Sequence, residues 1–403
     1  MAEQGLQSQS IDEDALVKWA AELPMSDRLR AEAARVFAAT GLPGRRLEGW
    51  RWTDIRSAVR KLGQPKGGRP KATLLRNPMG LEFAFGNNMH SAPPEHAGFR
   101  WSSENLAEAI LPLDGMPMAA LAAAGSWPKA QRLIEVLQSI SEPVRLSFSS
   151  SEGRHWSHAR VRIAAGVEVT VIETHANPDE ISSVLVEYEV EDGATLNRVI
   201  WQDGSPGAVM VAAGTVRLGK GARLNQTTLA FGAKIARMET RVLHAASGSE
   251  ATLNGVYMVS AGKHADFTSH VQHAAPSCVT RQTVKGLARA GGKGVFQGKF
   301  LVERNGQKTD AQMQHNALLL EDGAEINAKP ELEIYADDVT CNHGNTSGQL
   351  DLAALFYMRQ RGIPEAEARA MLAESFVAEA LSGAGEPWAD QLMGEARAWL
   401  NAP

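Results

Sequence analysis

A five-residue pattern recurs in the middle of the chain and restricts the folds available to it. The pattern is glycine or glutamate, alanine, a variable residue, leucine or isoleucine, and asparagine. Its copies are Gly193–Asn197, Gly221–Asn225, Glu250–Asn254 and Gly323–Asn327. The first three recur about every 28 residues, a period typical of stacked-coil architectures. The glycine suits a tight corner, the leucine or isoleucine an internal stack, and the asparagine a turn.

Short runs rich in β-branched residues lie among these copies. The runs are Val144–Phe148, Val167–Glu173, Val184–Val190, Val209–Leu218 and Thr240–Leu243. Glycine, aspartate and asparagine punctuate them, which is typical of strands joined by turns. We therefore predict a mainly β fold whose core, residues 143–344, is a stacked β-solenoid or β-helix. Two packed antiparallel sheets are the alternative that the pattern also allows.

The N-terminal region, residues 1–142, is predicted to be helical and to contain a linker. Apolar residues at helical spacing from Ile11 to Thr40 indicate two helices. The next segment, LPGRRLEGWRWTDIRSAVRKL, is helix-like, and its Trp50 and Trp52 favour anchors of a small core over a binding box. Glycine, proline and lysine over residues 63–71 indicate the linker.

The C-terminal region, residues 345–403, is predicted to be a helical domain. One helix ends at Gly362, a second begins near Pro364, and Trp388–Leu400 forms a third. These helices carry more large apolar side chains than three short helices need for a core of their own. The candidates for a partner interface are Phe356, Tyr357, Leu372 and Phe376. The same face could instead cover the end of the solenoid.

The charge balance excludes two classes of partner. With 403 residues and a net charge of −5, the chain lacks the basic surface that nucleic acids and anionic membranes require. No apolar run approaches the roughly 18 to 20 residues of a membrane-spanning helix, and the N-terminus lacks a signal-peptide pattern. We therefore expect a cytoplasmic protein. Its two cysteines, Cys278 and Cys341, are too few for a disulfide framework.

Two other segments contain incomplete motifs. Gly214–Lys220 (GTVRLGK) resembles the start of a phosphate loop, but Gly221 replaces the Ser or Thr that would bind Mg²⁺, so no nucleotide site is predicted. The segment HADFTSHVQH contains metal-ligand types, with His264 and Asp266 on one face of a strand. A metal-dependent hydrolase or a polysaccharide-active enzyme could use this pair. Structural hydrogen bonding is the simpler interpretation.

Cys341 and His343 are better candidates for chemistry. The alternation in Glu331–Ala336 predicts a strand that ends at Asp337–Asp338. If the chain is extended again from Val339, the cysteine and histidine project from one face, with Cα atoms roughly 6.5 to 7 Å apart. One thiolate and one imidazole cannot complete a site, because zinc and iron–sulfur clusters normally take about four protein ligands. The remaining ligands would come from another chain.

The sequence around these two residues resembles one known family. QKTDAQMQHNALLLEDGAEINAKPELEIYADDVTCNHGNTSGQLDLAALFYMRQRGI, with KGVFQGKF upstream, is similar to the SufB/SufD family of iron–sulfur cluster assembly proteins. The segment LPGRRLEGWRWTDIR also resembles the family's P-x-x-x-x-E-x-W-x-x-T segment. Asn342 and Asn345 depart from the commoner Ser-His-Gly-Ala, yet both candidate ligands are present. Within this family, SufB members carry additional cysteines, whereas this chain has only Cys278 outside the motif, so the resemblance implies the SufD branch.

The resemblance implies a right-handed parallel β-helix between N-terminal and C-terminal helical domains. It also implies a non-catalytic scaffold that pairs with SufB through the β-helices and carries the ATPase SufC on its C-terminal helices. A homodimer remains open for the isolated chain. The resemblance further implies a transient iron–sulfur cluster at the SufB interface, where His343 and its neighbour Cys341 match the family's proposed ligand positions. No nucleotide would be bound by this chain itself.

Overall fold

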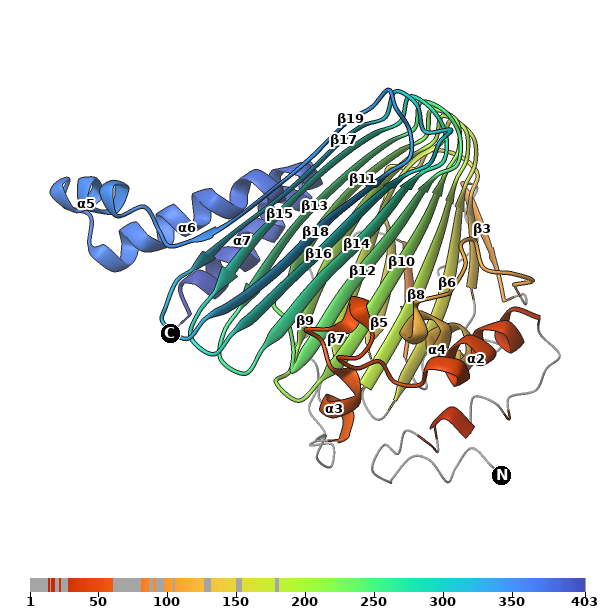
Figure 1. The fold of residues 1–403 in the computed structure, drawn as a ribbon, viewed down its shortest axis with the longest axis horizontal. Coiled ribbons are helices and arrows are strands. Elements are labelled where there is room, and N and C mark those ends of the chain that lie inside the picture. The colour runs from red at the N-terminus through yellow and green to blue at the C-terminus, as the bar shows by residue number, and fades with distance from the viewer. Residues whose placement is uncertain are drawn as a thin grey trace.

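Two long sheets face each other and form the body of the protein (Figure 1). The computed structural model describes residues 14, 16–18, 22, 28–60, 81–86, 90–91, 98–103, 106–126, 132–149, 154–177 and 181–402. The chain alternates between the sheets and adds a strand to each in turn, with helices near both termini packed outside. The prediction of a β-solenoid with flanking helices is confirmed. The predicted linker over residues 63–71 and most of the first predicted helix lie outside the described residues.

Nearly all the described strand pairs of the solenoid run parallel. Sheet A has ten strands and sheet B has nine. Sheet A contains β1 (Leu81–Phe85), β2 (His90–Ser91), β5 (Val144–Ser149), β7 (Glu168–Asn177), β9 (Thr195–Gly204), β11 (Arg223–Ala230), β13 (Glu250–Val259), β15 (Val279–Ala288), β17 (Asp310–Leu319) and β19 (Thr340–Gly348). Sheet B contains β3 (Phe99–Ser102), β4 (Arg132–Val136), β6 (His155–Ile163), β8 (Ile181–Val190), β10 (Val209–Leu218), β12 (Ile235–His244), β14 (His264–His273), β16 (Lys293–Val302) and β18 (Glu325–Ile334). The alternative of two antiparallel sheets is therefore wrong, because only the short pairs β1–β2 and β3–β4 run antiparallel among the described strands.

The helices lie on opposite sides of this body. The N-terminal group contains α2 (Arg28–Thr40), the 3₁₀ turn η2 (Glu48–Trp50), α3 (Ile55–Arg60) and α4 (Pro117–Gly125). The C-terminal group contains α5 (Leu352–Gln360), α6 (Glu365–Leu381), the 3₁₀ turn η3 (Ser382–Ala384) and α7 (Trp388–Leu400). The three predicted C-terminal helices are thus confirmed. None of the helices in the described part of the chain is long and apolar enough to cross a membrane.

The strand register corrects the alignment of the sequence repeat. Leu196 pairs with Leu224, as the repeat predicts, but Leu224 then pairs with Ala251 rather than with Leu253. The third copy is therefore displaced by two residues, which keeps each side chain on its predicted face because the strand period is two. The fourth copy, Gly323–Asn327, lies at the opposite corner, where the chain enters β18 of sheet B.

The repeat asparagines lie in strands and not in turns. Asn225 Nδ2 donates a hydrogen bond of 2.9 Å to Asn197 Oδ1, which links two adjacent strands of sheet A. The glycines do make the corners, since Gly193 and Gly221 have φ angles of 67° and 61°. Only glycine adopts this left-handed backbone conformation without steric cost.

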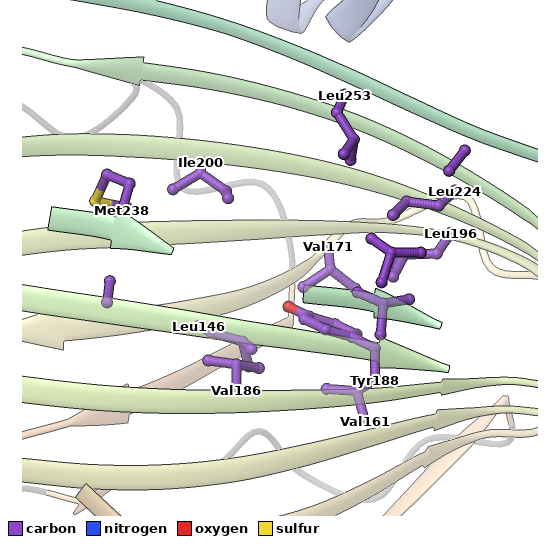
Figure 2. Close-up of a cluster of buried hydrophobic side chains, with 14 of the residues drawn as sticks. Leu146, Val161, Val171, Val186, Tyr188, Leu196, Ile200, Leu224, Met238 and Leu253 are labelled. Atoms are coloured by element: carbon purple, nitrogen blue, oxygen red, sulfur yellow. The ribbon is translucent and has the colours of Figure 1, made fainter. Parts of the chain in front are cut away.

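Side chains from both sheets fill the space between them, which we call the lumen. Figure 2 shows Leu196 and Leu224 from sheet A gathered with Val161 and Tyr188 from sheet B. All four belong to one continuous buried cluster. Burial of this apolar surface stabilises the stack, because each strand covers the side chains of its neighbours from water.

Each sheet also buries its outer face. The N-terminal helices pack on sheet B, with Trp50 buried among them as predicted. The C-terminal helices pack on sheet A around Trp201 and Met258, where Leu392 is fully buried. The C-terminal apolar residues therefore cover a face of the solenoid and not its end, which corrects one alternative left open by the sequence.

The two ends of the solenoid differ. At the first end, the antiparallel strands β2 and β3 lie outermost in sheets A and B. At the other end, β18 and β19 are the outermost strands, and no described strand pairs with their outer edges. Their outward backbone N–H and C=O groups form an open edge.

Replacing Gly286 with alanine is expected to destabilise the fold. An added Cβ would lie 2.2 Å from Cζ of Tyr257, whose ring is fully buried in the lumen. Overpacking of this kind costs about 1–3 kcal/mol in the free energy of unfolding, which denaturant titration measures. Gly344→Ala in β19 is the control, because nothing lies within 4 Å of its Cβ position. Equal midpoints for the two variants would contradict this packing.

Two histidines are buried face to face at one corner of the lumen. The rings of His244 and His273 stack with centroids 4.6 Å apart, and their Nε2 atoms lie 3.0 and 2.9 Å from Thr280 Oγ1. Burial lowers the pKa of His244 well below 6.5 and that of His273 to about 4. Both imidazoles are therefore neutral in the folded protein at pH 7.

Folding stability is expected to fall as the pH drops below about 6.5. An unfolded histidine takes up a proton there, whereas folded His273 does so only near pH 4, so protonation favours the unfolded state. The loss from His273 alone is roughly 1.4 kcal/mol at pH 5.5. Thermal unfolding between pH 8 and pH 5 measures this slope. His273→Gln should flatten the profile and the exposed-site variant His343→Gln should not; a His273→Gln profile as steep as the parent's would refute the assignment.

Candidate functional site

Cys341 and His343 lie on β19 at the open end of the lumen. Cys341 pairs in register with Ala311, and His343 pairs with Met313. Both partners are buried members of the lumen cluster, so the two candidates share the inward face of the last strand. The spacing in the sequence predicts this shared face. Cys341 is half-buried against the cluster, whereas His343 is exposed.

The preceding strand differs from its predicted position. β18 begins at Glu325 and ends at Ile334, so Tyr335 and Ala336 belong to the corner that leads into β19. Within β18, Pro330 pairs with Gly298 of the neighbouring strand. A proline cannot donate a backbone hydrogen bond and is confined to edge strands, so this residue is a sequence signal for the terminal position that the repeat alone does not reveal.

The Cys341 thiol is protonated at neutral pH in the isolated chain. Partial burial raises its pKa, a hydrogen bond to the Ala311 backbone offsets part of this increase, and the nearby Asp310 carboxylate adds a smaller increase. A thiol of this kind becomes a good ligand only when a metal ion displaces its proton. Within the described residues, no three His, Cys, Asp or Glu side chains are grouped to hold a metal ion.

A hydrogen-bonded chain leads from the open end into the lumen. His315 Nδ1 lies 2.6 Å from Asn345 Oδ1, and His315 Nε2 lies 2.9 Å from the Tyr257 hydroxyl. The His315 ring stacks on Phe296 with centroids 4.7 Å apart. Sequence reasoning missed this chain. The alternation of Ala311, Met313 and His315 would have placed the histidine inward, but its partners depend on the register.

Charged side chains are buried farther inside the lumen. Glu173 Oε1 accepts hydrogen bonds of 2.5 Å from both Tyr188 and Arg198, and Arg198 Nη1 donates to Gln226 at 2.7 Å. Burial alone would raise the pKa of Glu173, but Arg198 and His175 hold it near 2. Gln226 also borders a cavity of about 30 Å³, large enough for a bound water. No pattern in the sequence predicts this network.

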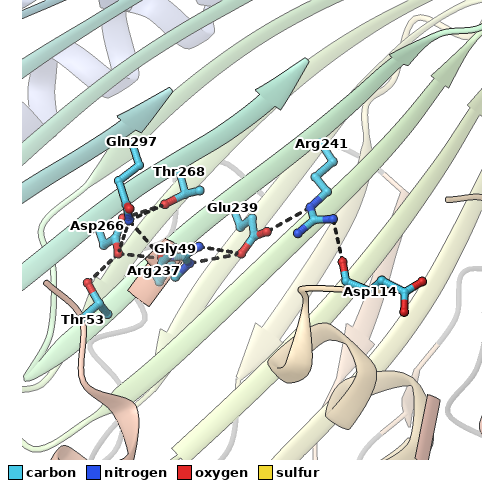
Figure 3. Close-up of polar contacts among 9 residues, drawn as sticks. All are labelled: Gly49, Thr53, Asp114, Arg237, Glu239, Arg241, Asp266, Thr268 and Gln297. Carbon is cyan, nitrogen blue, oxygen red and sulfur yellow. Dashed lines mark hydrogen bonds and ion pairs between the residues drawn. The ribbon is translucent and has the colours of Figure 1, made fainter. Parts of the chain in front are cut away.

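His264 and Asp266 lie on the outer face of sheet B beneath the N-terminal segment. Thr53 Oγ1 donates to Asp266 Oδ2 at 2.5 Å (Figure 3). The same hydroxyl lies 3.1 Å from His264 Nε2. Arg237 Nη1 also donates to Asp266 Oδ2, at 3.0 Å. Because protein groups occupy the carboxylate and the imidazole, the pair has a structural role, which disfavours the hydrolase interpretation.

Arg237 on β12 holds the same N-terminal segment against sheet B. Its guanidinium lies 3.9 Å from the centroid of the Trp50 ring and donates to the Gly49 carbonyl at 2.6 Å. Gln297 of β16 also donates to Gly49, and Lys329 of β18 pairs with Glu48. The segment around Trp50 therefore lies across the outer face of sheet B and contacts β12, β14, β16 and β18.

The predicted partner-interface residues separate into two groups. Phe356 and Tyr357 on α5 are 63% and 59% exposed, whereas Leu372 and Phe376 on α6 are half-buried. Phe376 packs on sheet A, with Lys285 Nζ 4.8 Å from its ring centroid.

Two further apolar side chains are exposed on these helices, Leu352 on α5 and Met371 on α6. They were missed in the sequence because helical spacing alone does not determine exposure. Figure 1 shows α5 projecting away from the solenoid.

The glycine–lysine segment has no helix behind it. Gly214–Leu218 completes β10, Gly219–Ala222 forms the corner, and β11 follows. A phosphate loop needs a helix N-terminus at this point, so the segment is a solenoid corner.

Comparisons with known proteins match the chain to one family. The model described as "SUF system FeS cluster assembly, SufBD core domain" matches residues 147–376. The iron–sulfur cluster assembly SufBD family protein Rv1462 of Mycobacterium tuberculosis is 30% identical over 258 residues, which cover 62% of this chain and 65% of that protein. The iron–sulfur cluster assembly protein SufD of Escherichia coli is 31% identical over 228 residues, covering 56% of this chain and 54% of SufD.

A plant protein shows the same likeness. Protein ABCI7, chloroplastic, of Arabidopsis thaliana is 29% identical over 226 residues, covering 55% of this chain and 48% of that protein. The chain thus spans less than two thirds of the length of these relatives. The family match nevertheless covers more than half of the chain and includes the solenoid strands from β6 to β19. The protein with this open-ended solenoid therefore belongs to the SufBD family of SUF-system iron–sulfur cluster assembly proteins.

Proposed function

We propose that this chain is a non-catalytic, SufD-type scaffold subunit that helps a SufB-type partner assemble an iron–sulfur cluster. The observation that carries the proposal is the location of Cys341 and His343 on the inward face of the last strand, at an end that no described strand covers. A soft and a borderline ligand are thereby presented to whatever binds that end. The low number of cysteines, two in 403 residues, favours the SufD role over the SufB role.

An incomplete ligand set is what a shared site requires. A cluster normally takes about four protein ligands, and this strand offers two. The partner would supply the others, and separation of the two chains would release the cluster. In this proposal the cluster is transient cargo, and no nucleotide is bound by this chain.

The edges of β18 and β19 are the proposed SufB contact. Their outer backbone groups can pair with strands of another solenoid, as in β-strand addition. Ile334, the last residue of β18, and Tyr335, which follows it, are 40% and 57% exposed and would add apolar contact area. The likeness to Escherichia coli SufD supports a paralogous partner, and two copies of this chain could meet in the same way when SufB is absent.

The exposed surface of α5 and the start of α6 is the proposed site for the ATPase SufC. Leu352, Phe356, Tyr357 and Met371 expose apolar area that the chain's own cores do not cover. The remaining C-terminal side chains fix α6 and α7 to sheet A, so a protein bound to α5 would be joined firmly to the solenoid.

Removal of the His343 imidazole is expected to lower cluster yield on the complex with SufB and SufC without preventing assembly of the subunits. The side chain is exposed, so its loss removes a ligand and little packing. Anaerobic co-expression, followed by visible absorption and iron analysis, measures the yield, and size-exclusion chromatography measures assembly. Asn342→Ala is the matched control on the outward face of β19. Undiminished yield in His343→Ala would remove the ligand role.

Substitution of Phe356 and Tyr357 by alanine is expected to weaken SufC binding about tenfold or more, because exposed aromatics are frequent binding hot spots. Calorimetric titration of SufC into the complex of this chain with SufB measures the affinity. Gln360→Ala on the same helix is the control, since Gln360 is exposed but polar. Unchanged affinity of the double variant would place the SufC site elsewhere.

A further inference from the structure

The Tyr257–His315–Asn345 chain joins three strands of sheet A. Tyr257 lies on β13, His315 on β17 and Asn345 on β19, so the chain reaches from the buried interior to the last strand. Tyr257 and His315 are fully buried, whereas Asn345 is exposed. Glycines at 286 and 294 leave room for the tyrosine ring, since a Cβ at either position would lie within 2.3 Å of it. The absence of side chains at these two glycines therefore makes room for the Tyr257 ring.

Hydrogen-bond chemistry fixes the direction of the chain. A buried tyrosine hydroxyl must donate, and the only acceptor it meets in the described part of the protein is His315 Nε2. That leaves His315 Nδ1 as the protonated nitrogen, which donates to Asn345 Oδ1. Burial lowers the pKa of His315 to about 4, so the ring stays neutral and retains this tautomer at pH 7.

The orientation of the Asn345 amide follows from these bonds. Its oxygen accepts from His315, which leaves the NH₂ group as the part of the amide that can donate to a group bound at the open end. Asn345 and His343 are two residues apart on the same face of β19, with Cα atoms roughly 6.5 to 7 Å apart. A hydrogen-bond donor in a fixed orientation therefore stands beside the candidate ligand.

We propose that Asn345 Nδ2 donates a hydrogen bond to an anionic sulfur atom, a sulfide or a thiolate, of the cluster assembled beside His343. His315 and Tyr257 are positioning residues that hold the amide in this orientation. Hydrogen bonds to cluster sulfurs stabilise the negative charge on them and raise the reduction potential. This inference rests on the proposed function and assigns to it a residue that is not a metal ligand.

Asn345→Asp isolates the donor from the structural contact. An aspartate oxygen can still accept from His315 Nδ1, but a charged oxygen replaces the NH₂ group that would donate. Asn342→Asp adds the same charge on the outward face of β19 and is the control. The variants are compared as complexes with SufB and SufC, loaded anaerobically with ferrous iron and sulfide.

We expect Asn345→Asp to reduce cluster occupancy at limiting iron and sulfide about tenfold, and to lower the reduction potential of any cluster retained. Asn342→Asp should change neither quantity. Occupancy and potential of Asn345→Asp equal to those of Asn342→Asp would overturn the proposal.

The positioning role is tested by His315→Gln and His315→Phe. Glutamine can accept from Tyr257 and donate to Asn345, whereas phenylalanine can do neither. We expect His315→Gln to retain parental occupancy and His315→Phe to lose it, with the thermal midpoint of each complex measured as a fold control. A well-folded His315→Gln complex as impaired as His315→Phe would overturn the positioning role.

His343→Ala distinguishes this proposal from the one on which it rests. If His343→Ala lowers occupancy and Asn345→Asp does not, the donor assignment fails and the scaffold proposal survives. If His343→Ala retains parental occupancy, that result contradicts the ligand role of His343, whatever the result for Asn345→Asp.

Discussion

Parallel backbone hydrogen bonding between successive strands is the interaction on which this structure depends. A solenoid strand has few local partners, and its N–H and C=O groups are satisfied only by the strands before and after it. Strands of about ten residues in continuous register meet this need along both sheets. The requirement fails only at the ends. One end has antiparallel strands outermost, and the other leaves β18 and β19 with open edges.

Polar groups inside the lumen are a second constraint. A buried charge is costly unless it is paired and hydrogen-bonded, and Glu173 and Arg198 meet both conditions. On the outer face of sheet B, Arg237 meets Asp266, Glu239 and the ring of Trp50. Loss of one member of such a group leaves the others unsatisfied, so these networks also specify how the N-terminal segment lies on the sheet.

The architecture is easier to predict from the sequence than the individual side-chain contacts are, and the reasons are physical. Turn glycines and alternating apolar residues report local backbone geometry, which is why the solenoid and the shared face of Cys341 and His343 could be predicted. The displacement of the third repeat could not, because a shift of two residues leaves the inward and outward pattern unchanged. Contacts such as Thr53 with Asp266, 213 residues apart, depend on how the helices dock on the sheets. The link between His315 and Asn345 likewise needs the register of neighbouring coils.

The composition of the final coil explains how the open edge of β18 and β19 avoids uncontrolled polymerisation of the protein. β19 reads TCNHGNTSG and contains no Val, Ile, Leu, Phe, Tyr or Trp, while β18 carries Lys329, Pro330 and two glutamates among its last six residues. Fibril-forming edges are rich in β-branched and aromatic residues, low in charge and free of proline. Identical molecules would therefore gain little from indefinite end-to-end stacking. In the proposed complex, the SufB surface that covers this edge would have to complement its charges and its proline.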